Sequence, residues 1–128
     1  MRTISKIIIL LIGITVMNTS DLNAQEKGKI LRHVVLIKFK DSSSAADVEK
    51  VEKAFAGLSK SIPLIKSFEW GLNNSPENLN QGLTHCFLAA FSSEKDRDAY
   101  LIHPKHKDFV ALAGPHFDKV TVVDYWTR

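Results

Sequence analysis

Residues 31–40 read LRHVVLIKFK, and this stretch decides the fold. Side chains alternate along a β-strand, so the segment has two faces. One face carries His33, Val35, Ile37 and Phe39, and the other carries Val34 and Leu36. Both faces are therefore apolar at mid-strand. A strand buried on both sides is expected where one face meets helices and the other meets a second sheet.

The segment that follows predicts a helix and then an edge strand. Ser44 and Asp47, three residues apart, form a loose capping box at the start of the helix, and Pro63 ends it. Its apolar stripe recurs every three or four residues, at Val48, Val51, Phe55, Leu58 and Ile62. Residues 64–72 alternate between apolar side chains on one face and more polar side chains on the other, which predicts a strand at the edge of a sheet. Residues 73–82 are rich in turn formers and predict a long loop.

The second half of the chain repeats this pattern. Residues 84–91 predict another strand that is apolar on both faces. Ser92 and Ser93 then cap a short helix to about residue 102, and Pro104 restarts a helix to about residue 113. Gly114 and Pro115 stop that helix, and residues 119–126 predict the last strand.

The order strand, helix, strand, strand, helix, strand predicts an α+β, ferredoxin-like βαββαβ fold. In this topology the antiparallel sheet has the strand order fourth, first, third, second. The start of the first strand then lies beside the end of the last. His33 and Asp124 should therefore be neighbours, although 91 positions separate them.

The first 24 residues have the pattern of a secretory signal peptide. Arg2 and Lys6 precede an apolar run over residues 7–17, and Ala24 suits the last position before a cut. The run has about half the roughly 20 residues that a membrane-spanning helix needs. We therefore predict a signal peptide over 1–24, a linker over 25–30, one domain over 31–126, and a secreted or periplasmic location with no membrane attachment after cleavage.

Composition excludes several partners. Removal of Arg2, Lys6 and Asp21 with the signal leaves 15 basic and 13 acidic residues, a nearly balanced charge. Nucleic acid and anionic membranes need a clustered basic surface, so neither is expected as a partner. The lone Cys86 cannot form an internal disulfide and is expected to be a small buried apolar residue.

Residues 100–106, Tyr-Leu-Ile-His-Pro-Lys-His, bring titratable groups to one helix break. Imidazole titrates near neutral pH, so His106 is a candidate general base and Tyr100 a candidate hydrogen-bond donor. His103 is expected to shape the break. A metal held by His103, His106 and Asp108 is disfavoured, because the proline makes the directions of the two imidazoles uncertain. We expect no metal and no cofactor.

The chain resembles the stress-responsive dimeric α/β barrel, or Dabb, domain family. The resemblance rests on His33 with residues 34–40, on residues 82–85, on the His-Pro-x-His pattern within 100–106, and on residues 123–125. It implies a homodimer whose two sheets close into a barrel with helices outside. A branch of plant polyketide cyclases in this family has catalytic residues that match His33, Tyr100, His106 and Asp124. Phe55 stands where the cyclases have a tyrosine lining the pocket.

Three functions remain open at this point. The first is binding of a small apolar or carbonyl-containing ligand in a cavity between helices and sheet, contacted by Phe55, Leu58 and Trp70. The second is a polyketide-cyclase-like lyase with His106 as general base, Tyr100 as donor, and His33 with Asp124 orienting and stabilising charge. The third is a purely structural or stress-protective dimer. A haem-degrading function has no distinctive support in the sequence.

Overall fold

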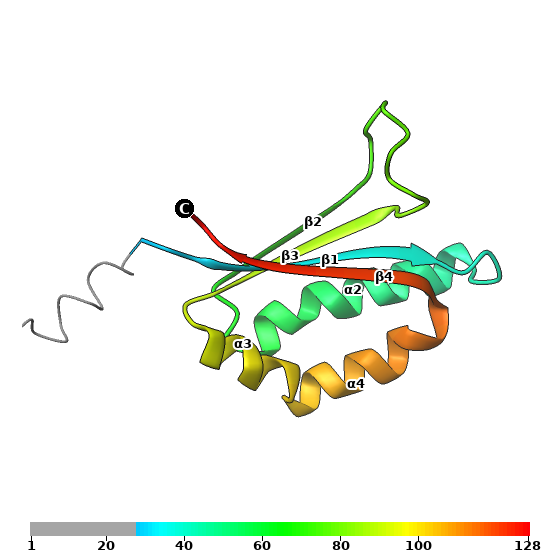
Figure 1. Ribbon diagram of the computed structural model, residues 1–128. Coiled ribbons are helices and arrows are strands. Elements are labelled where there is room, and N and C mark those ends of the chain that lie inside the picture. The colour runs from blue at the N-terminus through cyan, green and yellow to red at the C-terminus, as the bar shows by residue number, and fades with distance from the viewer. Residues whose placement is uncertain (1–27) are drawn as a thin grey trace, which may run out of the picture.

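The computed structural model describes residues 28–128, so the predicted signal peptide lies outside the described residues. The elements are β1 (Leu31–Phe39), α2 (Ala45–Ser61), β2 (Ser67–Leu72), β3 (His85–Phe91), α3 (Glu94–Leu101), α4 (Pro104–Ala113), the 3-10 turn η1 (Gly114–His116) and β4 (Phe117–Trp126). Figure 1 shows the sheet above and the helices below it. No helix within residues 28–128 is long and apolar enough to cross a membrane.

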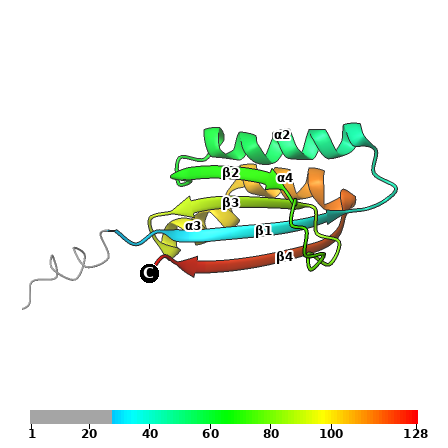
Figure 2. The ribbon, with the colours of Figure 1, turned by 90° about the horizontal axis from the view of Figure 1, so that it is seen from above.

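The four strands form one antiparallel sheet in the order β2-β3-β1-β4, which Figure 2 shows from above. This confirms the predicted ferredoxin-like topology. β1 pairs with both β3 and β4, and His33 lies directly opposite Asp124 in the β1–β4 register. The predicted neighbourhood of these two residues is therefore confirmed.

Local capping explains where the helices begin. Ser44 and Asp47 form the full capping box at the start of α2, with hydrogen bonds of 3.1 and 3.0 Å. The Ser93 side chain accepts from the Asp96 amide at the start of α3. His103 caps α4 by accepting from the Lys105 amide at 3.1 Å, with Pro104 at the first helical position. His103 thus shapes the break, as the sequence predicts.

Two strand boundaries differ from the prediction. β2 begins at Ser67 instead of residue 64, because the Ile65 amide bonds back to the Ile62 carbonyl and the Ile65 side chain is buried in the core. β4 begins at Phe117 instead of residue 119, because the chain leaves α4 through the short turn Gly114–His116.

The core lies between the sheet and the helices. Its centre is an aromatic cluster in which Phe55 of α2 stacks on Phe109 of α4, with ring centroids 4.5 Å apart, and meets Phe87 of β3 edge-on at 4.3 Å. Such pairs contribute beyond the apolar area that they bury. This cluster holds α2 and α4 at fixed positions over the sheet.

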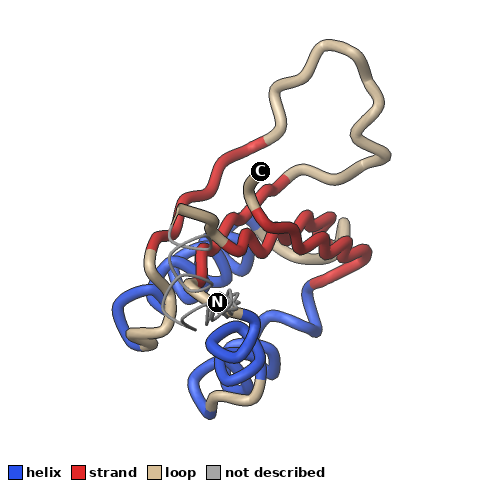
Figure 3. The backbone as a smooth tube through the Cα atoms, turned by 60° about the vertical axis from the view of Figure 1, so that its left-hand side comes forward, coloured by secondary structure: helices blue, strands red, loops and turns tan. Residues whose placement is uncertain are grey.

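The helices of residues 28–128 all lie on one face of the sheet, and the opposite face carries none of them (Figure 1). By register its central side chains are apolar or weakly polar: Val34, Leu36, Cys86, Leu88, Val123 and Tyr125. Cys86 is only half-buried there, so the expectation of a buried cysteine is wrong for the single chain. Cys86 lies on the helix-free face, where no layer formed by the described residues covers it. The loop between β2 and β3 extends away from the helices (Figures 1 and 3).

Candidate functional site

A cavity of about 550 Å³ lies between the sheet and the helices. Its residues come from β1, β4 and all three helices, and one end of it carries every titratable group that lines it. Apolar side chains form most of the rest: Val35, Ile37, Phe55, Phe109, Val120 and Val122. The volume is within the range of small-molecule sites.

Asp124 bridges two side chains at the polar end of this cavity. Its Oδ1 accepts from His33 Nδ1 at 2.7 Å, and its Oδ2 accepts from Arg97 Nη1 at 2.7 Å. His33 is buried and the Asp124 side chain is mostly buried. An ionised carboxylate only accepts, so Nδ1 of His33 carries a proton. The hydrogen bonds to Asp124 and then to Asp98 raise the pKa of Arg97, which stays charged.

Tyr100 and His106 lie beside this bridge, with ring centroids 4.5 Å apart. Burial raises the pKa of the Tyr100 phenol, so the hydroxyl stays protonated and can donate a hydrogen bond. Burial is also the main cause that lowers the pKa of His106, which favours the neutral imidazole. His106 Nδ1 lies 3.0 Å from the Leu101 carbonyl oxygen. A carbonyl cannot donate, so Nδ1 carries the proton and Nε2 keeps a lone pair.

Three polar atoms of these side chains are open to the cavity. Among residues 28–128, no hydrogen bond uses His33 Nε2, the Tyr100 hydroxyl or His106 Nε2. No fully buried side-chain nitrogen or oxygen in that range lacks a partner. All three residues line the cavity, so these atoms have accessible surface on the cavity side. Together they offer a donor, a base and a further imidazole nitrogen to a bound molecule.

The four predicted catalytic residues, His33, Tyr100, His106 and Asp124, are thus brought together at one end of one cavity. The predicted ligand contacts are placed less uniformly. Phe55 lines the cavity, whereas Leu58 is buried in the core and Trp70 lies apart, against Phe87 and His85. Neither Leu58 nor Trp70 lines this cavity.

Arg97 is a site residue that the sequence reasoning missed. It precedes Tyr100 by three residues in α3, a spacing that puts both side chains on the same side of a helix. That spacing was the available signal. The Ser93 cap fixes the start of the helix and so the direction in which Arg97 points.

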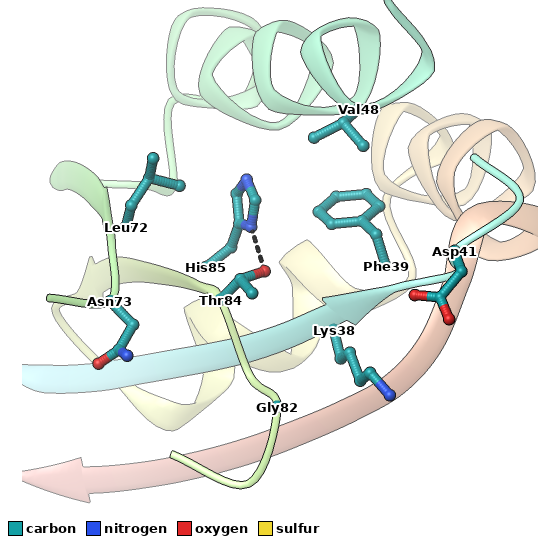
Figure 4. Close-up of a pocket in the computed structure, with 9 residues that line it drawn as sticks. All are labelled: Lys38, Phe39, Asp41, Val48, Leu72, Asn73, Gly82, Thr84 and His85. Carbon is teal, nitrogen blue, oxygen red and sulfur yellow. Dashed lines mark hydrogen bonds between the residues drawn. The ribbon is translucent and has the colours of Figure 1, made fainter. Parts of the chain in front are cut away.

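A second cavity, of about 470 Å³, lies where β1 ends, beside β2 and β3, and shares no lining residue with the first (Figure 4). His85 is one of its lining residues. Its Nε2 lies 2.8 Å from Glu52 Oε1. Its Nδ1 lies 2.8 Å from the Thr84 hydroxyl (Figure 4). His85 is buried with both ring nitrogens bonded, so it is a hydrogen-bonded core group.

The remaining histidines also have structural partners. His103 caps α4, and His116 Nδ1 lies 2.9 Å from the Ser43 hydroxyl in the turn before β4. Within residues 28–128 no group of three or more histidine, cysteine or acidic side chains could hold a metal ion.

Comparison with known proteins places these observations in a family. The model of the stress responsive A/B barrel domain (Dabb) matches residues 31–127. The stress-response A/B barrel domain-containing protein HS1 of Arabidopsis thaliana is 40% identical over 101 residues, which cover 79% of this chain and 92% of HS1. Olivetolic acid cyclase of Cannabis sativa is 31% identical over 98 residues, which cover 77% of this chain and 97% of the cyclase.

Solved structures agree with this placement. Hydroxynitrile lyase from Passiflora edulis has a TM-score of 0.74 at 25% identity, and the match covers 77% of this chain and 94% of the lyase. A dimeric ferredoxin-like protein of unknown function from Thermobifida fusca has a TM-score of 0.66 at 24% identity, over 76% and 90% of the two chains. The second similarity concerns the fold alone.

Proposed function

Because this chain belongs to the stress-responsive A/B barrel (Dabb) domain family, we propose that it binds a small, largely apolar molecule carrying a carbonyl oxygen. The cavity beside β1 and β4 is the binding site. One observation carries the proposal: His33 Nε2, the Tyr100 hydroxyl and His106 Nε2 have no hydrogen-bond partner within residues 28–128, and their residues line one end of a largely apolar cavity of about 550 Å³. Apolar walls supply affinity, and a few placed polar groups fix the orientation of the ligand.

Filling the cavity tests the binding proposal. Val122 lines the cavity from β4 and is 52% exposed, so Val122→Phe adds volume there without disturbing the closed core. We expect it to weaken binding of 2-nonanone or acetophenone at least about tenfold, measured by NMR titration, because the ring occupies ligand space. Ile102→Phe is the control, since Ile102 is 69% exposed and does not line the cavity. Equal affinity in wild type and Val122→Phe, or no binding by wild type, would contradict the proposal.

A second candidate function is proton transfer on a bound carbonyl compound. The specific observation is the tautomer of His106, whose Nδ1–H is held by the Leu101 carbonyl so that the Nε2 lone pair is available. In the proposed step the α-C–H bond breaks and the proton passes to Nε2. The C–H electron pair forms the C=C bond of an enolate, and the carbonyl π pair moves to the oxygen, which accepts a hydrogen bond from Tyr100. Two relatives are named as a cyclase and a lyase, which supports this class of chemistry.

We also propose that the protein acts as a homodimer, in an extracytoplasmic space if residues 1–24 are a signal peptide. The helix-free face of the sheet supports the dimer, because it presents central apolar side chains such as Val34, Leu36 and Leu88 without a covering layer. Fold relatives are described as dimeric. A second copy of the same face would bury these side chains. In this arrangement a purely structural, stress-protective role remains the alternative if no ligand binds.

A charged side chain on that face should separate the two copies. Val123 is 52% exposed in the single chain, so Val123→Lys is expected to leave the fold intact while raising the dimer dissociation constant at least about 100-fold, because a buried unpaired ammonium is costly. Sedimentation equilibrium measures the constant. Val110→Lys, on α4, is the control. A wild-type monomer at micromolar concentration, or an unchanged constant in Val123→Lys, would overturn the dimer.

A further inference from the structure

Three charged side chains line the polar end of the ligand cavity side by side. Arg97 Nε donates to Asp98 Oδ1 at 2.9 Å, and Arg97 Nη1 donates to Asp124 Oδ2 at 2.7 Å. Asp124 Oδ1 also accepts from His33. One guanidinium is thus shared between two carboxylates. The charges of Asp98, Arg97 and Asp124 leave an excess of one negative charge at this end.

Arg97 is the one permanently charged cation that lines this end within the described chain, so it cannot balance both carboxylates. The further titratable groups that line the cavity are His33, Tyr100 and His106. The phenol is protonated and neutral, and burial favours the uncharged form of His106. No lysine of residues 28–128 lines the cavity, and Arg97 is its one arginine. A ligand carboxylate placed near His33 and Tyr100 would meet an arginine already neutralised by its neighbours.

We propose that the Asp98–Arg97–Asp124 cluster makes this site selective for uncharged oxygen-bearing ligands, such as ketones, aldehydes and esters, against carboxylates of the same shape. This selectivity rests on the proposed binding function and names its ligand class. Asp98 is the residue that sets it, because Asp98 lines the cavity and supplies the carboxylate in excess of the Arg97–Asp124 pair.

The expected strength of the selectivity follows from the solvent exposure of the Asp98 side chain. The Asp98 side chain is 66% exposed, so water and salt screen its field more than that of Asp124. We therefore expect a ketone to bind about tenfold more tightly than the matched carboxylate. Removal of the Asp98 charge should reduce this ratio several-fold.

The experiment compares 2-nonanone with octanoate, and acetophenone with benzoate, by NMR titration of the wild-type protein and of Asp98→Asn. Titration at pH 8 keeps an ordinary imidazole uncharged. Asparagine retains an oxygen that accepts from Arg97 Nε, so the variant removes charge with little change in shape. Asp108→Asn is the matched control, since Asp108 is exposed on α4 and does not line the cavity.

The proposed selectivity concerns the ratio of the carboxylate dissociation constant to that of the matched ketone. This ratio should exceed one in the wild type for both ligand pairs. Asp98→Asn should lower it, and Asp108→Asn should leave it unchanged. Equal or tighter wild-type binding of octanoate and benzoate would overturn the selectivity alone, as would an equal fall of the ratio in both variants. Binding of neither ketone nor carboxylate would overturn the proposed binding function, and the selectivity with it.

Discussion

Replacing Asp124 by alanine is expected to lower the free energy of unfolding by roughly 2–4 kcal/mol, because it removes the shared acceptor of two mostly buried donors. His33 and Arg97 would both lose their partner, and the Arg97 charge would remain close to an apolar cavity. The estimate lies somewhat below that for a fully buried pair, since the Asp124 side chain is 22% exposed. Urea denaturation followed by circular dichroism measures the change.

Asp118→Ala is the matched control for this variant. Asp118 lies on the same strand and forms an ion pair with Lys38 at 2.9 Å, but its side chain is 50% exposed. Exposed pairs contribute about 0–1 kcal/mol, so the control should unfold close to wild type. Equal destabilisation by the two substitutions would show that the Asp124 bridge has no special energetic role.

Replacing His106 by alanine is expected to reduce α-proton exchange of a bound ketone by about 10²–10⁴-fold, the usual contribution of a positioned general base. Deuterium incorporation from D₂O into 2-nonanone, followed by NMR, measures the step directly. The pKa of His106 is lowered by burial, so the basic form persists below the ordinary imidazole range. The acid limb of the wild-type rate should therefore lie below pH 6.5, with activity present above that limb and lost as pH falls through it.

His103→Ala separates base catalysis from helix structure. His103 caps α4, so its loss should cost about 1 kcal/mol of stability, as other caps do, while exchange continues. His106→Ala should give the opposite result, since His106 is only partly buried and its hydrogen bond to the Leu101 carbonyl is exposed. Full exchange activity in His106→Ala would exclude His106 as the base.

Much of this site could be predicted from the sequence because strand order determines it. Residues 31–40 are apolar on both faces, which indicates a central strand. Together with the order of the elements, this predicts that the first and last strands pair and that His33 lies beside Asp124. The Ser44 box and Pro104 fix helix starts through short-range hydrogen bonds, which depend on neighbours in sequence.

The contacts that could not be predicted depend on how helices rotate and pack over the sheet. The Arg97–Asp124 bond requires the turn of α3, and the Glu52–His85 bond joins α2 to β3 across 33 positions. Leu58 shares the apolar stripe of Phe55, yet only Phe55 reaches the cavity. Periodicity identifies the buried face of a helix, but not which of its members borders empty space.

The pairing of β1 with β4 also bears on how the molecule folds. Leu31 lies opposite Trp126, so the central strand gains its second partner from the last residues of the described domain. Contacts between such distant segments slow folding, because a long loop must close before they form. A ribosome-bound chain lacking β4 would hold His33 without its carboxylate. The polar end of the cavity is therefore among the last parts of the molecule to assemble. The aromatic contact between α2 and β3 can form before it.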